Sequence, residues 1–446
     1  MSETKSEIIL DKNEVSTVIP IVSPKSTTVE KPRYYYIDNL RFFLTFLVVI
    51  HHCFWVVIAG WHPFYRPWQL DTPSIVLGYM LLSGNQSYFM GLFFFLSGLT
   101  TIPSLKRKGS LQFIKDRFIR LVIPVIIYEL VLFPLLYCFL ESTWYGPQRG
   151  TTSTINDVWV YYFQNYHFTS NQMWFTITLF FFNIWTIIIY EIINTKLISK
   201  CSLSLKYLTY CCCHRFDRHI AVSSTTSSTD NTSTVNGDSV TSRDIAILLC
   251  KISFLSFILN YIMRIFFSEN GYIWVPVLAN LGFIMQYIIA YILGIVANSL
   301  QFLDFQLNKE YIIMLARASI NLYFTFETCQ TYSYIPLITY TGFYVSTLLI
   351  TFFEQFFAIF FSMLLLVLFK IYWNTKPKYT LVNKIINASY ATYIIHQWII
   401  IPVAVGLAYT NIHPFGVIII LCFVTPILSF GCGIGIKLLP KADMIV

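Results

Sequence analysis

Three side chains near the start of the sequence, Arg41, His51 and His52, could do chemistry within an otherwise apolar segment. At about 100° per residue of helix, Arg41 and His52 differ by about 20° around the axis and by about 16 Å along it. His51 lies about 80° from Arg41 on the same helix. This alignment favours His52 over His51 as the histidine that faces an internal cavity. A neutral imidazole there could remove a proton from a hydroxyl group.

Each of these side chains also has an ordinary structural interpretation. Arg41 could be an interfacial arginine that extends towards water, with Asp38 one helical turn away. Adjacent histidines within a span could simply hydrogen-bond to a neighbouring helix. The segment alone leaves both interpretations open, including whether His52 acts as a base.

Further along the chain, other charged and imidazole groups fall inside apolar segments, where ionisable side chains are costly and are functional candidates by default. Arg264 and His396 are two of them. Arg117 and Arg120 lie one helical turn apart where an apolar segment begins. They are the best candidates among the basic residues at 106–120 to attract an anion such as a CoA phosphate. The simpler explanation for the lysines of that stretch is membrane topology.

The composition identifies the elements that must position these groups. Of 446 residues, 56% are hydrophobic and only 12% are charged, whereas a soluble domain has about 25% charged residues. The mean hydropathy is +0.62. These values argue against a soluble enzyme, a nucleic-acid-binding protein and a disordered protein. They predict an all-α polytopic membrane protein, because lipid-exposed backbone must satisfy its own hydrogen bonds.

About ten segments are long and apolar enough to cross a bilayer, which takes about 20 residues. The weakest of them contains Arg317, Asn321 and Glu327. The expected spans are 37–60, 80–102, 113–139, 173–195, 246–267, 273–298, 311–335, 344–373, 381–406 and 414–438.

Lysine and arginine residues concentrate in alternate connections, which places both termini in the cytoplasm. The polar residues 1–32 then form a disordered cytoplasmic tail, and residues 439–446 form a cytoplasmic tail at the other end. The Ser/Thr-rich insertion at 196–245 is expected to be a disordered cytoplasmic loop within a transmembrane domain at 33–438. In this loop, Cys211–Cys213 could be S-acylated or unmodified. Three adjacent cysteines do not suit a metal site, and no metal is expected.

Several segments, in order, resemble the acyltransferase 3 family of integral membrane acyltransferases, and most closely its bacterial glucan-modifying branch. The first helix has the family's arginine and histidine, here Arg41 and His52, and Gln172 departs from the pattern because a histidine is common there. The resemblance covers about residues 33–438. The segments are YIDNLRFFLTFLVVIHH at 36–52, FFFLSG at 93–98, KDRFIRLVIP at 115–124, MWF at 173–175, YIMRIFF at 261–267, QYIIAYILGIVA at 286–297 and ASYATYIIHQ at 388–397.

The resemblance implies transfer of an acyl group, often acetyl or succinyl, from a cytoplasmic donor such as acyl-CoA. The acceptor would be a hydroxyl or an amine of a carbohydrate, lipid or other molecule, with a hydroxyl favoured here, and no bound cofactor is expected. His52 would be the essential base, and Arg41 would organise or neutralise the donor or the active site. Our hypothesis leaves open that His52 transiently carries the acyl group. Arg117 and Arg120 would hold the anionic donor, and the cavity would be lined by Trp174, Arg264 and His396.

The membrane that holds the protein, either the plasma membrane or an internal membrane, does not follow from the sequence. An alternative function is a secondary transporter or exporter that uses the same polar intramembrane cavity without chemistry. The lack of detectable inverted repeats argues against this alternative.

Overall fold

The computed structural model describes residues 34–60, 64, 67–149, 154–164, 171–194, 242–267, 281–299, 309–332, 344–440 and 442. Residues 35–446 belong to one compact unit. The expected tail at 1–32, nearly all of the insertion at 196–245 and Cys211–Cys213 lie outside the described residues.

The described residues form helices and no β-strand, which confirms the all-α prediction. Nine helical segments in the described part of the chain are long and apolar enough to span a membrane, so the chain is a polytopic membrane protein. These segments are α1 (Tyr35–Ile58), α2 (Thr72–Lys108), Ser110–Gln148, Asn171–Asn194, Ile245–Phe266 within α10 (Ser242–Phe266), α11 (Leu281–Ser299), α13 (Val345–Tyr372), α15 (Ser389–Ala408) and α16 (Pro414–Lys437).

The tenth expected span, 311–335, corresponds to the helix α12 (Lys309–Tyr332), which packs along α13. It is helical as expected but too polar to count among the nine, because it carries Glu310, Arg317 and Glu327 within its length. Whether α12 crosses the bilayer decides whether the number of crossings is odd or even. The cytoplasmic location of both termini therefore stays a prediction.

The segment expected as one span at 381–406 is two helices. A short helix, α14 (Thr380–Asn387), ends at Ala388, and α15 begins at Ser389. The Ser389 hydroxyl donates a hydrogen bond to the Ile386 carbonyl at 2.7 Å and so satisfies an acceptor near the end of α14. The ninth span thus begins at Ser389, eight residues later than the sequence pattern suggested.

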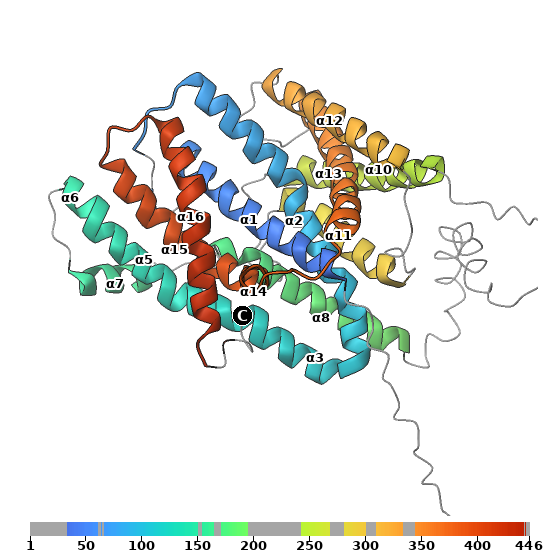
Figure 1. Cartoon of the computed structure of the whole chain (residues 1–446), viewed down its shortest axis with the longest axis horizontal. Coiled ribbons are helices and arrows are strands. Elements are labelled where there is room, and N and C mark those ends of the chain that lie inside the picture. Colours follow the sequence, from blue (N-terminus) through green and yellow to red (C-terminus); the bar gives the residue numbers. More distant parts are fainter. Residues whose placement is uncertain are drawn as a thin grey trace, which may run out of the picture. The chain divides into compact units, whose positions relative to one another are not determined.

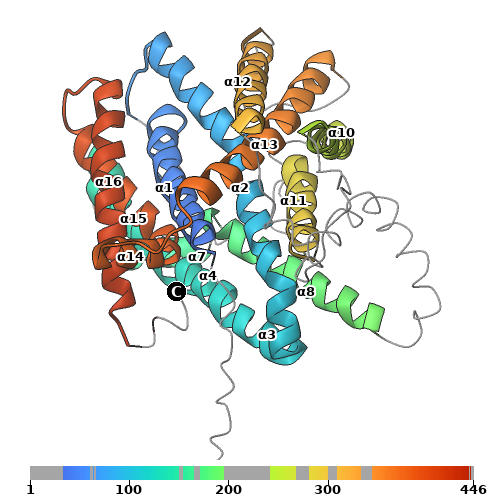
Figure 2. The ribbon, with the colours of Figure 1, turned by 45° about the vertical axis from the view of Figure 1, so that its right-hand side comes forward.

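The helix α2 joins the two sides of the transmembrane unit (Figure 1). Asp71 caps its first turn by accepting a hydrogen bond from the Ser74 backbone at 3.4 Å, and hydrogen bonding from Ser74 lowers the pKa of Asp71. On one side α2 contacts α1, which in turn contacts α15 and α16. On the other side it contacts α11 and α13, and α13 packs against α10 and α12. The pairs α15–α16 and α12–α13 lie side by side in Figures 1 and 2.

The crossing of α2 and α11 depends on two glycines in direct apposition. A Cβ atom on Gly98 would lie 2.2 Å from the Tyr291 carbonyl oxygen, and one on Gly294 would lie 2.1 Å from the Phe95 carbonyl oxygen. Neither position can hold a side chain without separating the helices. Small residues at such crossings let membrane helices pack backbone to backbone.

The segment Ser110–Gln148 is a continuous helical span that is interrupted by three π-helical turns. Each turn ends two residues before a proline, whose ring would clash with the carbonyl four residues earlier in an α-helix. The wider π turn relieves this clash, so the prolines explain the interruptions. The turns and their prolines are Phe118–Val122 with Pro124, Tyr128–Leu132 with Pro134, and Glu141–Tyr145 with Pro147.

Proline also lacks the N–H that would serve a carbonyl of the preceding turn, and for two of the three prolines a tyrosine elsewhere in the fold supplies the missing donor. The Tyr390 hydroxyl donates to the Arg120 carbonyl, four residues before Pro124. Likewise, the Tyr409 hydroxyl donates to the Thr143 carbonyl, four residues before Pro147. These bonds fix the Ser110–Gln148 segment against both ends of α15.

Candidate active site

The helices α1 and α15 bring His52 and His396 into contact. His52 Nδ1 lies 3.2 Å from His396 Nε2, and the ring centroids are 4.9 Å apart. His396 is fully buried, whereas His52 is half-buried. The more accessible member of the pair is therefore the histidine that shares a helical face with Arg41.

An apolar cluster packs directly beyond the two histidines along both helices. From α1 it includes Val49 and Cys53, and from α15 it includes Ile400 and Ile401. The Cys53 thiol is itself hydrogen-bonded to the Thr425 hydroxyl of α16 at 3.0 Å. This close packing fixes the relative height of α1 and α15, which sets the distance between the imidazoles.

The adjacent His51 points towards different neighbours. Its ring stacks on Trp55 and packs 5.1 Å from the Phe89 ring of α2, and the residue is 5% exposed. His51 is therefore part of an aromatic contact between α1 and α2. The structure thus separates the two histidines as the helical periodicity suggested, with His52 directed towards α15.

The tautomer of His52 follows from its contact with the backbone. Nδ1 lies 2.9 Å from the Val48 carbonyl oxygen, which can only accept a hydrogen bond. Nδ1 must therefore carry the proton in this arrangement, and Nε2 is left with the basic lone pair. A half-buried neutral imidazole with a basic Nε2 is suited to remove a proton from a hydroxyl group.

Three arginines from α1 and the start of the Ser110–Gln148 segment form a second group. Arg117 interacts electrostatically with both Arg41 and Arg120. Arg41 also donates to the Leu96 carbonyl of α2 at 3.1 Å and pairs with Asp38 at 3.7 Å. Like charges that approach one another favour binding of an anion that reduces their repulsion.

Aromatic side chains on α15 connect the arginine group to the histidine pair. Tyr390, which donates to the Arg120 backbone, stacks on Tyr393 with ring centroids 6.3 Å apart. Tyr393 in turn contacts the His396 ring at 6.0 Å. Tyr390 and His396 are separated by about 9 Å along the helix axis. The helix α15 therefore contacts the Arg120 backbone through Tyr390 and His52 through His396.

Trp174 lies at the beginning of α8 (Trp174–Asn194), among aromatic rings rather than against His52. Its ring is 5.4 Å from Tyr287 of α11 and 6.4 Å from Phe94 of α2. The ring centroids of the neighbouring Phe175 and of Tyr393 are 6.2 Å apart. Because Tyr393 and His396 both lie on α15, this helix connects the aromatic cluster to the histidine pair. That Trp174 lines a cavity stays a prediction.

The structure places Arg264 in a separate polar cluster between α10, α11 and α13. Arg264 pairs with Glu354 at 2.7 Å, with 0% and 6% of the two side chains exposed. It also donates to the Thr351 hydroxyl at 3.0 Å and to the Gly282 carbonyl at 3.3 Å. The guanidinium lies over the Phe283 ring at 4.8 Å. The structure thus gives Arg264 a fixed carboxylate partner.

Two glutamines anchor polar contacts near the histidine pair, and one of them, Gln397, was not singled out from the sequence. Gln397 accepts a hydrogen bond from the Tyr128 hydroxyl, and both residues are buried. The Gln172 side-chain amide donates to the Ile394 carbonyl at 2.7 Å, and the Gln172 backbone carbonyl accepts from the Tyr393 hydroxyl. Gln172 therefore anchors α15 although it departs from the family pattern. Uncharged polar residues within spans were the available signal for this group.

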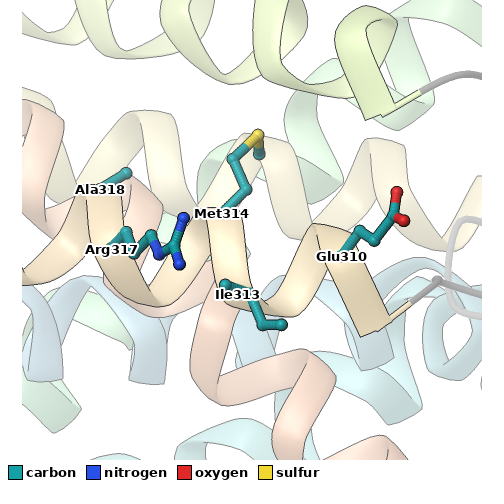
Figure 3. Close-up of a pocket in the computed structure, with 5 residues that line it drawn as sticks. All are labelled: Glu310, Ile313, Met314, Arg317 and Ala318. Carbon is teal, nitrogen blue, oxygen red and sulfur yellow. The ribbon is translucent and has the colours of Figure 1, made fainter.

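A recess of about 540 Å³ lies on α12, apart from the histidine pair. Figure 3 shows Arg317 and Glu310 on the same stretch of that helix, with Met314 and Ile313 between them. The recess has no group suited to act as a base at neutral pH other than the Glu310 carboxylate at its edge. It is therefore a weaker candidate for chemistry than the site around His52.

A protein-family model described as an acyltransferase domain, of the acyltransferase 3 type, matches residues 34–220. Residues 34–220 therefore form a domain of the acyltransferase 3 type. The family resemblance seen in the sequence is confirmed over these residues, and the domain is that of an enzyme that transfers acyl groups other than aminoacyl groups. No curated protein and no solved structure matches the chain significantly.

The matched part of this membrane acyltransferase contains most of the candidate residues. Arg41, His52, Arg117, Arg120 and Trp174 lie inside it. Arg264 and His396 lie beyond it, and His396 nevertheless reaches His52 through the packing of α15 against α1.

Proposed function

We propose that this acyltransferase moves a small acyl group, such as acetyl or succinyl, from a cytoplasmic acyl-CoA to a hydroxyl of a carbohydrate or lipid, with His52 as the base. The observation that carries the proposal is the contact of His52 Nδ1 with the Val48 carbonyl at 2.9 Å. This contact leaves Nε2 as the basic nitrogen of a half-buried ring, on the face of α1 that also carries Arg41.

The arginine group supports an anionic donor. Coenzyme A carries several phosphate charges, and arginine binds phosphate through charge-assisted hydrogen bonds. Arg117 and Arg120 lie where the Ser110–Gln148 segment begins, and Arg117 interacts electrostatically with Arg41. In this proposal the phosphates bind to these guanidinium groups, and the thioester arm extends along Tyr390 and Tyr393 to His52.

The reaction then requires one proton acceptor and one acyl transfer. His52 Nε2 removes the hydroxyl proton while the hydroxyl oxygen attacks the thioester carbonyl. The carbon–sulfur bond breaks, and the departing thiolate takes the proton from His52, which yields an ester and free coenzyme A. A second route uses the same nitrogen to carry the acyl group before the hydroxyl attacks. Both routes require His52 in its Nδ1-protonated tautomer.

The proposal is tested with labelled acetyl-CoA, purified full-length protein in lipid nanodiscs, and a membrane extract that contains glycans and lipids. We expect the label to pass from acetyl-CoA into extracted material in a protein-dependent manner. Mass spectrometry of glycans and lipids from cells with and without the protein then identifies the acceptor. Flux of a substrate across vesicles without any consumption of acetyl-CoA would contradict the proposal.

A further inference from the structure

The contact between His396 and His52 carries an inference that rests on the proposed role of His52. His396 lies on α15, beyond the residues matched by the family model, and is 0% exposed. Its Nε2 atom lies 3.2 Å from His52 Nδ1. We propose that His396 is a positioning residue, which accepts the His52 Nδ1 proton and holds the imidazole with Nε2 directed to the reacting hydroxyl.

The hydrogen bonds of His396 define which of its nitrogens can accept. His396 Nδ1 lies 2.7 Å from the Tyr393 carbonyl oxygen, which can only accept. Nδ1 of His396 therefore carries a proton, and in the neutral ring its Nε2 has the lone pair. That lone pair faces the proton on His52 Nδ1. Two backbone carbonyls, those of Val48 and Tyr393, thus orient the pair of imidazoles as donor and acceptor.

The hydrogen bond to the Val48 carbonyl alone restrains the orientation of the His52 ring only weakly. In a helix this oxygen also accepts the backbone N–H of the residue four positions later, which is His52 itself. The Val48 carbonyl oxygen therefore accepts two hydrogen bonds, one from the His52 backbone and one from the His52 side chain. His396 Nε2 supplies a second acceptor for the same proton, on a different helix, and so restrains rotation of the His52 ring about its side-chain bonds.

The same contact gains strength during the reaction. When His52 Nε2 takes the hydroxyl proton, its ring becomes a cation, and the Nδ1 proton becomes a stronger donor. His396 Nε2 is then an acceptor already in place, in a buried environment that strengthens the bond. A hydrogen bond from a charged donor contributes more to stability than one between neutral groups. His396 therefore stabilises the state in which His52 holds the proton.

The test compares apolar and polar replacements of His396. His396→Leu removes the acceptor and keeps a similar volume, and His396→Phe does so with a ring. His396→Gln places an amide oxygen where Nε2 lies. With acetyl-CoA and the membrane extract, we expect kcat to fall about 10- to 100-fold in the apolar variants with little change in KM. We expect most of the activity to return in His396→Gln.

A purely structural role for His396 predicts a different order. Packing would be retained as well by Leu or Phe as by Gln, and activity would follow the stability of each variant. Equal kcat values for His396→Gln and the better-folded apolar variant would overturn the inference.

A spectroscopic measurement separates this inference from the proposed function. In protein labelled with ¹⁵N-histidine, protonated and unprotonated imidazole nitrogens resonate far apart, and the His52 signals are identified by their loss in His52→Gln. We expect one tautomer of His52, protonated at Nδ1, in the wild-type protein and a mixture in the apolar variants. Unchanged His52 signals in a folded apolar variant would overturn the inference. A single His52 tautomer together with no acetyl transfer would instead contradict the proposed function alone.

Discussion

Two buried polar clusters on opposite sides of α2 differ in how their ionisable groups are satisfied. Between α10, α11 and α13, Arg264 and Glu354 form an ion pair at 2.7 Å with almost no exposure of either side chain. Between α1 and α15, His52 and His396 form a pair of imidazoles at 3.2 Å, and His52 is half-buried. The sequence presents both as ionisable residues within apolar segments, yet only one has an accessible group with a basic lone pair.

Burial and hydrogen-bond partners distinguish an ionisable residue that stabilises the fold from one that can take part in a reaction. Arg264 has a carboxylate, a hydroxyl and a carbonyl as partners, so its charge is matched within the fold. His52 has acceptors placed at Nδ1, which direct the basic nitrogen elsewhere. A charge that is fully compensated and buried organises the fold, whereas a base must remain accessible to a substrate.

The largest expected effect tests the structural role of the ion pair. Removing one partner by Glu354→Leu leaves Arg264 buried without its counter-charge, which costs about 3–5 kcal/mol of stability. We expect the purified variant to lose most of its folded yield and to unfold at a much lower temperature in detergent. The double variant Arg264→Met with Glu354→Leu should recover both, because no buried charge then remains.

Acyl transfer by the double variant sharpens the comparison. If the Arg264 cluster only organises the fold, the recovered protein should transfer acetyl groups at close to the wild-type rate. A well-folded double variant without activity would show that Arg264 or Glu354 takes part in the reaction, and the contrast between the clusters would then be wrong.

A smaller effect is expected from the arginine group that lies on the histidine side. Arg117→Gln removes one charge that would bind a donor phosphate, and we expect KM for acetyl-CoA to rise about 10-fold or more with kcat retained. Lys378→Gln makes the same change in charge at an exposed site between α13 and α14 and should leave KM unchanged. The measurement is steady-state release of free coenzyme A.

The donor itself provides a second control for this prediction. Acetyl-pantetheine has the thioester arm without the nucleotide phosphates, so Arg117→Gln should not change its KM. If the substitution weakened both donors equally, Arg117 would act on the fold or on the thioester and not on the phosphates.

The smallest effects are expected from two tyrosines that serve proline-freed carbonyls. Tyr390→Phe and Tyr409→Phe each remove one hydroxyl donor, to the Arg120 and Thr143 carbonyls respectively, and should each cost about 1 kcal/mol of stability. Only Tyr390→Phe should also raise KM for acetyl-CoA, by a few-fold, because it lies beside the arginine group. Matching changes in KM for both variants would contradict a donor path along α15.

The sequence predicted the helices well because long apolar segments are a local signal. Helical periodicity within α1 favoured His52 over His51 as the histidine that faces a cavity. The structure gives the two rings different neighbours, and the cavity itself stays a prediction. The division at Ala388 was missed because α14 is apolar on one face and extends the hydrophobic run. A few charged residues in α12 were enough to make it too polar to count as a membrane span, because the mean hydropathy of a short helix depends on a few residues.

The partners of the candidate residues could not be predicted. His396 meets His52 only because α15 packs against α1, and nothing in either segment encodes that pairing. The partner of Arg264, Glu354, lies 90 residues later in the sequence on α13. The π-helical turns follow from prolines that were visible, but the tyrosines that complete them come from the other end of the chain.

The most direct test of the central claim compares the two adjacent histidines of α1. Purified His52→Ala and His51→Phe are assayed with labelled acetyl-CoA and the membrane extract, with thermal unfolding as the measure of folding. Loss of a general base should lower kcat of His52→Ala about 10²- to 10⁴-fold with folding intact. His51→Phe should remain active, since it retains the aromatic contacts with Trp55 and Phe89. Normal acetyl transfer by folded His52→Ala would contradict the account.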